Sequence, residues 1–465
     1  MQKNDILRVR IEEINNLGFG VAHAEEKNGS RGKVIFVRDA VTDDLLDARI
    51  IKVNKSYLIA KIERMIEPSA LRATEGVCTA AGCGGCVYQH IKYEHEAALK
   101  RDYVENAFRK AGLSDVRVGE LRHTGELTRY RNKAQYPVAL GKGGIEIGFY
   151  APKSHRVLDA MACALAPERF EEVLGVVRAF LEEYQISVYD EQSGRGLIRH
   201  IYLRRGEVSG ELLVCLVLTD KSLPHSEEFV HRIRSAFPET VGILINVNRD
   251  DTNVILGDTY DTLFGRDYIL DTLAGVELEI TAPSFYQVNH SATELLYAKA
   301  REVADLKGDE LLLDLYSGAG SIGLSMADGV REVIGIEIVP SAVECAKRNA
   351  NRGGIQNASF YTADASDTDL ILARAEAERG EPIRPDIVIL DPPRKGSTEK
   401  LLSFIANSLS PSRIVYISCN PETLARDCAI LRPMGYEIGV VTPVDLFPMA
   451  GHVESVVSLT RRLDS

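Results

Sequence analysis

A cysteine and a glutamate near the C-terminal end of the chain have the residue types of a nucleophile and a base. Cys419 lies in Ser-Cys-Asn-Pro, directly after the apolar run 414–417, so it is predicted at the end of a strand. Glu454, in Gly-His-Val-Glu, precedes another apolar run and is predicted at the start of a strand. A thiolate can form a covalent intermediate, and a carboxylate can remove a proton. Taken alone, however, Glu454 reads as an ordinary exposed carboxylate.

Acidic residues end a series of predicted strands in the same part of the chain. Asp314, Glu337, Asp364 and Asp391 follow one another at intervals of about 25 residues. A glycine-rich turn, Gly-Ala-Gly-Ser-Ile-Gly at 318–323, follows the first strand and opens a helix. Such a turn also occurs in NAD-binding domains. Carboxylates at four successive strand ends instead favour a cationic sulfonium cofactor, S-adenosylmethionine, and a Rossmann-like methyltransferase domain.

A methyl donor beside Cys419 suggests a pyrimidine as the methyl acceptor. Carbon 5 of uracil is a poor nucleophile, but a thiolate that adds to carbon 6 converts it into an enolate equivalent. Carbon 5 can then take the methyl group. A base must afterwards remove the carbon 5 proton so that the cysteine is eliminated, and Glu454 is the candidate for that role.

Five motifs together resemble the RNA 5-methyluridine methyltransferases of the TrmA/RumA type along the whole chain. They are Phe-Tyr-Gln-Val-Asn (285–289), the 313–324 segment, Asp-Pro-Pro-Arg-Lys-Gly (391–396), Ser-Cys-Asn-Pro (418–421) and Gly-His-Val-Glu (451–454). The resemblance implies that Cys419 is the nucleophile and Glu454 the base. It further implies that Phe285 faces the flipped base and that the 129–138 strand, with Arg131, faces the RNA. The implied S-adenosylmethionine ligands are Gln287, Tyr316, Ser321, Glu337, Asp364 and Asp391.

Four further cysteines have the spacing of a metal site. Cys78, Cys83 and Cys86 lie close together in the sequence, and Cys163 follows about 80 residues later. Spacing alone does not separate zinc from an iron–sulfur cluster. The segment Cys-Gly-Gly-Cys-Val-Tyr-Gln-His resembles the iron–sulfur segment of the same family, which favours a [4Fe–4S] cluster over zinc, although the first gap is one residue shorter than in many members. We expect this cluster to be structural, since the proposed chemistry moves no electrons.

The fold class predicted from these patterns is a multidomain α/β protein. Five short strand signals within 6–66 indicate a small OB-like barrel that resembles a TRAM domain, here assigned to 1–67. Strand signals with longer connections, preceded by a helical stretch at 95–111, indicate a central α+β domain at 68–280 that carries the cysteines. Alternating strands and helices over 281–465 indicate the doubly wound methyltransferase domain. The charged stretch 371–385 is predicted as a helix and loop without an assigned role.

Composition sets limits on partners and location. The net charge of −12 speaks against general nucleic-acid binding, but basic residues concentrate between Arg122 and Arg156 and again between Arg195 and Arg205. The N-terminal residues lack the apolar core of a secretory signal, and no run approaches the ~18 apolar residues of a membrane span. We expect a cytoplasmic monomer that binds RNA and no membrane.

Three functions are consistent with these sequence features. The first is methylation of carbon 5 of a uridine in 23S ribosomal RNA, because a TRAM-like barrel with a cluster resembles the members that act on that RNA; the same chemistry on transfer RNA is its alternative. The second is a catalytically idle RNA-binding protein, against which the presence of both Cys419 and Glu454 speaks. The third is an NAD-dependent oxidoreductase, which leaves the last three motifs unexplained.

Overall fold

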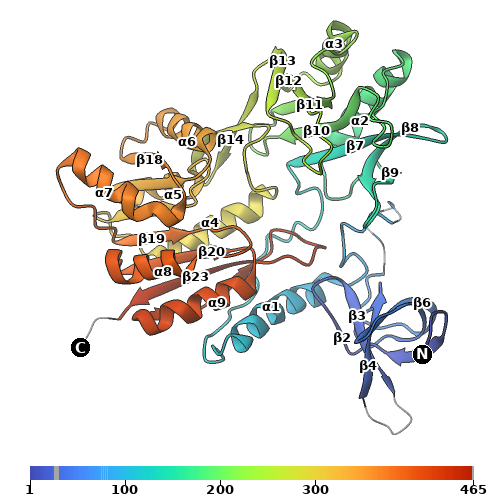
Figure 1. Ribbon diagram of the computed structural model, residues 1–465, viewed down its shortest axis with the longest axis horizontal. Helices are drawn as coiled ribbons and strands as arrows, with labels where there is room; N and C mark the ends of the chain where they lie inside the picture. The colour runs from blue at the N-terminus through green and yellow to red at the C-terminus, as the bar shows by residue number, and fades with distance from the viewer. Residues whose placement is uncertain (26–30, 75, 77, 79, 81, 463–465) are drawn as a thin grey trace.

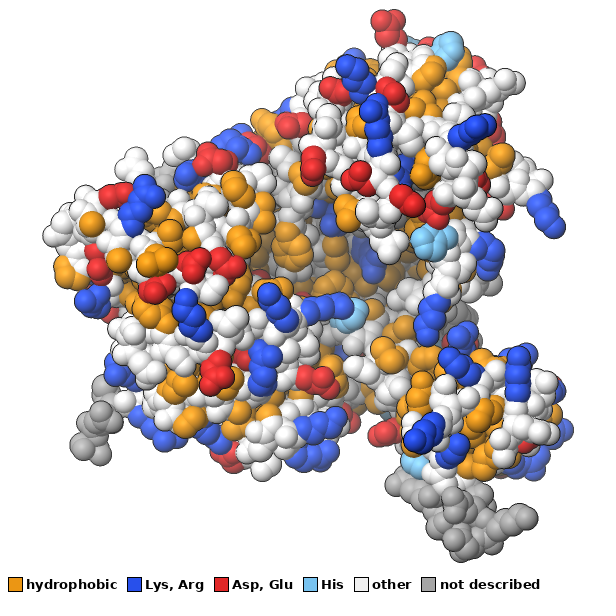
Figure 2. Space-filling model, viewed as in Figure 1, with side chains coloured by type: hydrophobic (Ala, Val, Ile, Leu, Met, Phe, Trp, Pro, Cys, Tyr) orange, Lys and Arg blue, Asp and Glu red, His pale blue; other side chains and the backbone are white. Residues whose placement is uncertain are grey.

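The protein folds into three lobes, seen in a computed structural model that describes residues 1–25, 31–74, 76, 78, 80 and 82–462. In Figure 1 a blue barrel lies at the lower right, a green sheet at the upper right, and a yellow-to-red sheet with its helices at the left. Figure 2 shows a deep hollow between the lobes, with hydrophobic side chains on its floor and Lys and Arg side chains near its rim. None of the described helices is long and apolar enough to cross a membrane.

The N-terminal lobe is a six-stranded sheet in the order β1-β5-β6-β4-β3-β2, curled around a small apolar core. The first predicted strand is divided in two, because Ile11 pairs instead with the turn at Asp43 and Asp44 and the chain bends there. The prediction of five strands was therefore one too few. The strands are β1 (Ile6–Arg10), β2 (Glu13–Ile14), β3 (Phe19–Glu25), β4 (Arg31–Arg38), β5 (Leu45–Val53) and β6 (Tyr57–Glu67).

The central lobe is a seven-stranded sheet in the order β13-β12-β11-β10-β7-β8-β9. Its two middle strands, β10 and β11, are almost wholly buried, as expected of strands covered on both faces. Only β11 is apolar throughout, because β10 also carries arginine and histidine side chains. One face packs against two helices, α2 (Glu168–Glu183) and α3 (Ser226–Ala236). The strands are β7 (Lys133–Gly141), β8 (Gly144–Tyr150), β9 (Val157–Asp159), β10 (Ile198–Arg205), β11 (Leu212–Leu218), β12 (Thr240–Val247) and β13 (Thr259–Gly265).

The C-terminal lobe is an eight-stranded sheet whose main path runs β18-β17-β16-β19-β20-β23-β21, with β22 paired to β23. Strands β16 to β20 are mutually parallel, and β23 enters antiparallel beside β20. This is the predicted doubly wound arrangement with a reversed strand added. The strands are β16 (Leu311–Leu315), β17 (Glu332–Glu337), β18 (Ala358–Thr362), β19 (Ile387–Leu390), β20 (Arg413–Ser418), β21 (Tyr436–Ile438), β22 (Thr442–Val444) and β23 (Glu454–Arg461).

Helices cover both faces of this sheet. The predicted charged helix at 371–385 is present as α7, although it begins earlier and ends at Arg379 before the loop. A two-stranded hairpin, β14 (Tyr268–Leu273) with β15 (Val276–Thr281), packs beside α4 and α6. The helices are α4 (His290–Ala304), α5 (Ser321–Met326), α6 (Pro340–Arg352), α7 (Thr368–Arg379), α8 (Glu399–Phe404) and α9 (Pro421–Leu431).

Helix α1 (Tyr93–Lys110) joins the barrel to the C-terminal lobe and packs against α9 (Figure 1). Its buried Lys100 ammonium donates to the Glu96 carboxylate at 2.6 Å, to the Asp445 carboxylate at 2.8 Å and to the Phe447 carbonyl at 3.0 Å. A buried ammonium requires such partners, since an unpaired charge in the interior is strongly destabilising. The domain limits at 67 and 280 stay a prediction.

Candidate active site

The predicted chemical residues surround one pocket of about 710 Å³ at the carboxyl edge of the C-terminal sheet. Parallel strands place their carboxyl ends at one edge, where ligands of such sheets bind. Most of the predicted site residues line this pocket, whereas Ser321 and Arg131 do not. The predicted residues in the lining are Phe285, Gln287, Tyr316, Glu337, Asp364, Asp391, Cys419 and Glu454.

Strand register brings Cys419 and Glu454 together. Strands β20 and β23 are antiparallel, and Ser418 is paired with Ser455 at the end of the ladder. One step further along the same register, Cys419 stands opposite Glu454. Side chains of directly opposed residues lie on the same face of a sheet with Cβ atoms about 5 Å apart. A thiol and a carboxyl group from segments distant in sequence therefore face the same pocket.

The glycine-rich turn and the two strand ends beside it form one wall of the pocket. Tyr316 has a left-handed backbone with φ of 65°, a strained conformation that is typical of functional turns. The Gly318 amide donates to one Glu337 carboxylate oxygen at 3.0 Å, and the Val339 amide donates to the other at 2.8 Å. Each oxygen retains a lone pair for a ligand hydroxyl. At the next strand end, Asp364 Oδ1 accepts hydrogen bonds from Ser366.

The Phe285–Asn289 loop is held by the central lobe. The Asn132 side chain donates to the Gln287 carbonyl at 2.8 Å, and the Asn132 amide donates to the Val288 carbonyl at the same distance. The buried Arg204 guanidinium donates to the Thr281 and Ser284 carbonyls at 3.0 Å. Within this fixed loop, Phe285 is 73% exposed, a high value for a phenyl ring beside a pocket. The ring is thus free to stack on a ligand.

Burial controls the charge of the pocket. Burial raises the pKa of Asp391 to about 7. Burial and the neighbouring Asp391 carboxylate raise the pKa of Glu454 to about 8, against the opposing effect of Arg394. Burial, followed by the Glu454 and Asp391 charges, raises the pKa of the Cys419 thiol to about 11. Without a bound cation, Glu454 is therefore largely protonated and Asp391 partly protonated at neutral pH, whereas hydrogen bonds from Ser366 lower the pKa of Asp364.

The pocket lining also includes residues that were not predicted from the sequence as site residues, among them Lys133, Arg394 and Phe447. Lys133 comes from β7 of the central lobe, and burial followed by Arg204 and Arg131 lowers the pKa of its ammonium to about 8. Arg394 and Phe447 lie in loops, and a nitrogen of the Arg394 guanidinium is 3.3 Å from His452 Nε2. Arg394 lies within the Asp-Pro-Pro-Arg-Lys-Gly motif and was therefore within reach of prediction. Lys133 reaches the pocket only through contacts between lobes, and Phe447 reaches it from the irregular loop between β22 and β23.

The four cysteines predicted as metal ligands are close in space, but their side chains do not have the arrangement of a metal site. Burial is the main cause that raises the pKa of Cys86, to about 12, and the charges of Cys163, Cys78 and Cys83 raise it further. Over the described part of the chain, no three His, Cys, Asp or Glu side chains are arranged to hold a metal ion. All four thiols are free and partly exposed. The structure thus places the four cysteines near one another, but their thiols are not arranged as the ligands of a bound metal ion.

Comparison with known proteins identifies the family. Residues 252–462 match the model of the tRNA (uracil-5-)-methyltransferase family, and residues 2–62 match the TRAM domain. An uncharacterised RNA methyltransferase of Halalkalibacterium halodurans is 39% identical over 99% of this chain and 98% of its own. A homologue of the same description from Clostridium tetani is 39% identical over 92% of this chain and 91% of its own.

A solved structure agrees with this assignment. The tRNA (uracil-54, C5)-methyltransferase of Pyrococcus abyssi, in complex with S-adenosyl-L-homocysteine, covers 98% of this chain and 100% of its own with a TM-score of 0.75 at 26% identity. The chain therefore belongs to the S-adenosylmethionine-dependent RNA uracil-5-methyltransferases. The predicted multidomain α/β fold with an N-terminal TRAM domain and the predicted class of enzyme are confirmed.

The pKa values predict that S-adenosylmethionine binds with release of protons. Its sulfonium charge favours ionised Asp391 and Glu454, whose pKa values of about 7 and about 8 leave them substantially protonated in the free protein. A raised carboxyl pKa means that the ionised form is gained as pH rises. Cofactor affinity should therefore increase about tenfold between about pH 6 and about pH 8.

Calorimetry in two buffers of different ionisation enthalpy measures this proton release. S-adenosylhomocysteine, which lacks the sulfonium charge, is the matched ligand and should show a weaker pH dependence. Asp391→Asn should flatten the pH dependence for S-adenosylmethionine. Equal slopes for the two ligands would show that the carboxyl groups do not respond to the sulfonium.

Proposed function

We propose that this protein transfers a methyl group from S-adenosylmethionine to carbon 5 of a specific uridine in 23S ribosomal RNA, through an adduct of Cys419 with carbon 6. The observation that carries the proposal is the opposition of Cys419 and Glu454 one step beyond the Ser418–Ser455 pair, at the edge of a pocket lined by strand-end carboxylates. A nucleophile, a base and a cation-binding wall are what methylation at carbon 5 needs.

The residues divide the reaction into steps. The partly exposed Cys419 thiol gives its proton to solvent, and its sulfur bonds to carbon 6, so that the electron pair of the carbon 5–carbon 6 double bond moves toward the oxygen at carbon 4. Bound S-adenosylmethionine supplies an electrophilic methyl group. Carbon 5 takes that methyl group, the Glu454 carboxylate removes the carbon 5 proton, and the sulfur leaves carbon 6 as the double bond re-forms. The thiolate stage is favoured by the positive charge of Arg394, which opposes the rise in the pKa of Cys419.

The remaining site residues bind and orient. Gln287, Tyr316, Glu337, Asp364 and Asp391 are proposed to hold the cofactor, with the exposed Phe285 ring stacked on the target base. Extrusion of that base from its stack costs a few kcal/mol, which contacts to the loop and the barrel offset. Ser321 and Arg131 stay predictions, since Ser321 bonds to the Tyr297 hydroxyl at 2.7 Å and neither residue lines the pocket.

Two classes of RNA are candidate substrates. The TRAM domain and the cysteine cluster favour 23S ribosomal RNA, because both features resemble members that act on it. Transfer RNA is favoured by the match to the Pyrococcus abyssi enzyme, which is named for uracil 54 of transfer RNA. The barrel suits either RNA, since OB-like surfaces bind backbone charge and stacked bases without a strict code.

Methyl transfer to unmodified RNA tests the function and separates the substrates. Protein purified anaerobically is incubated with labelled S-adenosylmethionine and either 23S ribosomal RNA or transfer RNA, and the labelled nucleoside is identified. We expect 5-methyluridine in ribosomal RNA, and no product with Cys419→Ala, which should still bind both RNA and cofactor. Label in transfer RNA alone would replace the substrate and keep the chemistry. Turnover by Cys419→Ala would overturn the covalent mechanism.

Glu454→Gln tests the assigned base. Methyl transfer can proceed in this variant, but carbon 5 keeps its proton and the sulfur cannot leave. We therefore expect a protein–RNA adduct that survives denaturation and migrates as a shifted band, with turnover reduced at least ~100-fold. The double variant Cys419→Ala, Glu454→Gln should give no band. Normal turnover without an adduct would assign the base elsewhere.

We also propose that Cys78, Cys83, Cys86 and Cys163 hold a [4Fe–4S] cluster, with zinc as the alternative. The cysteine segment is tied to the active-site loop, because the Tyr88 amide donates to the Met449 carbonyl at 3.0 Å. A cluster would keep that loop, and with it Phe447 and His452, in place.

Metal analysis of anaerobically purified protein tests the cluster. We expect about four iron and four sulfide per chain, the composition of the proposed cluster, with visible absorption that Cys163→Ser abolishes. Cys345→Ser is the control, since that thiol donates to the Glu279 carbonyl at 3.1 Å, a bond that a hydroxyl can also make. Stoichiometric zinc without iron would decide for the alternative.

A further inference from the structure

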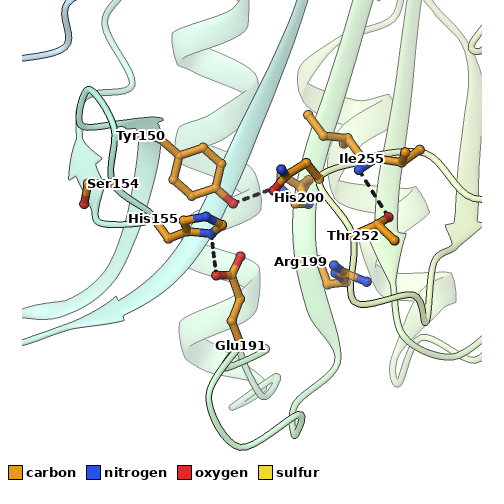
Figure 3. Close-up of a pocket in the computed structure, with 10 residues that line it drawn as sticks. Tyr150, Ser154, His155, Glu191, Arg199, His200, Thr252 and Ile255 are labelled. Atoms are coloured by element: carbon orange, nitrogen blue, oxygen red, sulfur yellow. Dashed lines mark hydrogen bonds and ion pairs between the residues drawn. The ribbon is translucent and has the colours of Figure 1, made fainter.

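A second pocket lies in the central lobe, outside the catalytic site. It has a volume of about 250 Å³, below the ~300–1,000 Å³ of typical sites for whole cofactors and drug-sized ligands. Figure 3 shows the Tyr150 ring beside the His155 ring, with the Tyr150 hydroxyl directed at His200. The lining residues are Tyr150, Ser154, His155, Glu191, Arg199, His200, Thr252, Asn253, Val254 and Ile255.

The walls of this second pocket combine rings, aliphatic groups and short polar groups. The Tyr150 and His155 ring centroids are 5.8 Å apart, and Val254 is 63% exposed. The Tyr150 hydroxyl lies 3.2 Å from His200 Nε2, and the Nδ1 atom of the buried His200 has no hydrogen-bond partner in the described structure. Ser154, Thr252 and Asn253 supply donors and acceptors at the lining. Such a mixture suits a small, flat ligand with polar edges.

The charges in the second pocket argue against an anion. Arg199 is the one Lys or Arg among its described lining residues, and Nη1 of its guanidinium donates to the Asn248 carbonyl, the Asn248 side chain and the Asp250 carbonyl. The same guanidinium lies over the Tyr189 ring at 4.7 Å. Burial and Arg199 lower the pKa of His200 to about 4, which keeps it neutral. The Nε atom of Arg199 has no hydrogen-bond partner in the described structure, but it is buried. A phosphate would also meet the Glu191 carboxylate, which lies 2.7 Å from His155 Nδ1.

The second pocket and the catalytic pocket lie on the same face of the central sheet. Lys133 lines the catalytic pocket and is paired with Arg204, whereas Pro137 is paired with His200 of the second pocket. Because side chains alternate along a strand, Lys133, Gln135 and Pro137 share one face of β7. Four residues of a strand span ~13 Å, and the half-exposed Gln135 lies between the two ends. That separation is short enough for neighbouring nucleotides of one RNA strand to reach both pockets.

We propose that the second pocket binds an unpaired nucleobase of the RNA substrate, close in sequence to the target uridine. The inference rests on the proposed function in that it takes RNA as the substrate. Sequence-specific recognition of RNA commonly uses splayed-out bases that stack on aromatic side chains and bond through their edges. The two rings, Val254 and the neutral polar lining provide those contacts, while Phe285 engages the target base elsewhere.

Substitution of the ring tests the nucleobase pocket. Tyr150→Ala should weaken binding of unmodified 23S ribosomal RNA or transfer RNA, whichever is methylated, by ~10-fold, the usual loss for a base-stacking aromatic. Affinity for S-adenosylmethionine should be unchanged. Tyr184→Ala is the matched control, since Tyr184 is half-buried in the same lobe but packs with α2 and its neighbours on the other face. Unchanged RNA affinity in a folded Tyr150→Ala would overturn the proposal.

A second pair of variants guards against misfolding of Tyr150→Ala. Val254→Asp places a carboxylate at the pocket wall, and Val208→Asp changes a valine of equal exposure, 62% against 63%, at a distant turn. RNA binding should weaken with Val254→Asp only. Equal effects of the two variants would show that added negative charge, and not the pocket, is responsible.

The salt dependence of binding separates a base from a phosphate. Loss of a stacked base in Tyr150→Ala should leave the slope of log affinity against log salt unchanged, whereas loss of a phosphate contact reduces it by about one. A reduced slope would assign the pocket to the RNA backbone and overturn the nucleobase proposal. Methylation of RNA by the wild-type protein is measured in a separate assay. Loss of the proposed function would appear in that assay, whereas failure of the nucleobase proposal would appear only in the binding of the variants.

Discussion

The antiparallel pairing of β23 with β20 is the constraint on which the active site depends. The parallel strands of this sheet present their carboxyl ends at this edge, and each can contribute the residue that follows the strand. A reversed strand instead contributes its first residue, so Glu454 arrives at the edge at the start of β23. The Ser418–Ser455 pair then fixes which residue faces Cys419. A slip of one residue would turn Glu454 to the opposite face of the sheet.

The electrostatics of the pocket suit a cationic ligand better than an empty cavity. Burial raises the pKa of Asp391, of Glu454 and of the Asp314 carboxyl beneath the glycine-rich turn, each to about 7 or about 8. Water cannot stabilise these charges at depth, and no basic group pairs with all of them. A sulfonium ion would supply the missing positive charge at the edge where the methyl group is needed. Binding of the cofactor and ionisation of these carboxyl groups would then occur together.

Local signals in the sequence were sufficient for the residues that strands carry to their ends. Asp391 and Cys419 each follow a short apolar run, and the parallel sheet places such ends together without further information. The position of Glu454 was also predicted, but its residue type alone fitted an ordinary exposed carboxylate, and its role as a base came from the chemistry at carbon 5 and from the resemblance to a family. The split of the first barrel strand depended on a contact between Ile11 and a turn more than 30 residues away, which no local pattern reports.

Contacts between lobes could not be predicted from the sequence. Lys133 reaches the pocket because the central lobe folds against the C-terminal lobe, and no spacing in the sequence indicates such an approach. The same holds for Lys100, whose partner Asp445 is 345 residues away. Apolar periodicity predicts that a helix is amphipathic, but it does not predict which surface the helix will cover. The apolar face of α1 covers α9, so the helix belongs structurally to the active-site lobe.

The loop between β22 and β23 shows why a methyltransferase of this kind benefits from its additional lobes. The loop carries Phe447 and His452 into the pocket and leads directly into Glu454. It is held from one side by Lys100, and its Met449 amide donates to the Glu96 carboxylate at 2.7 Å. The cysteine segment holds it from the other side through Tyr88. These contacts tie the loop to α1 and to the cysteine segment. Glu454, the proposed base, is therefore positioned by parts of the chain from the N-terminal half.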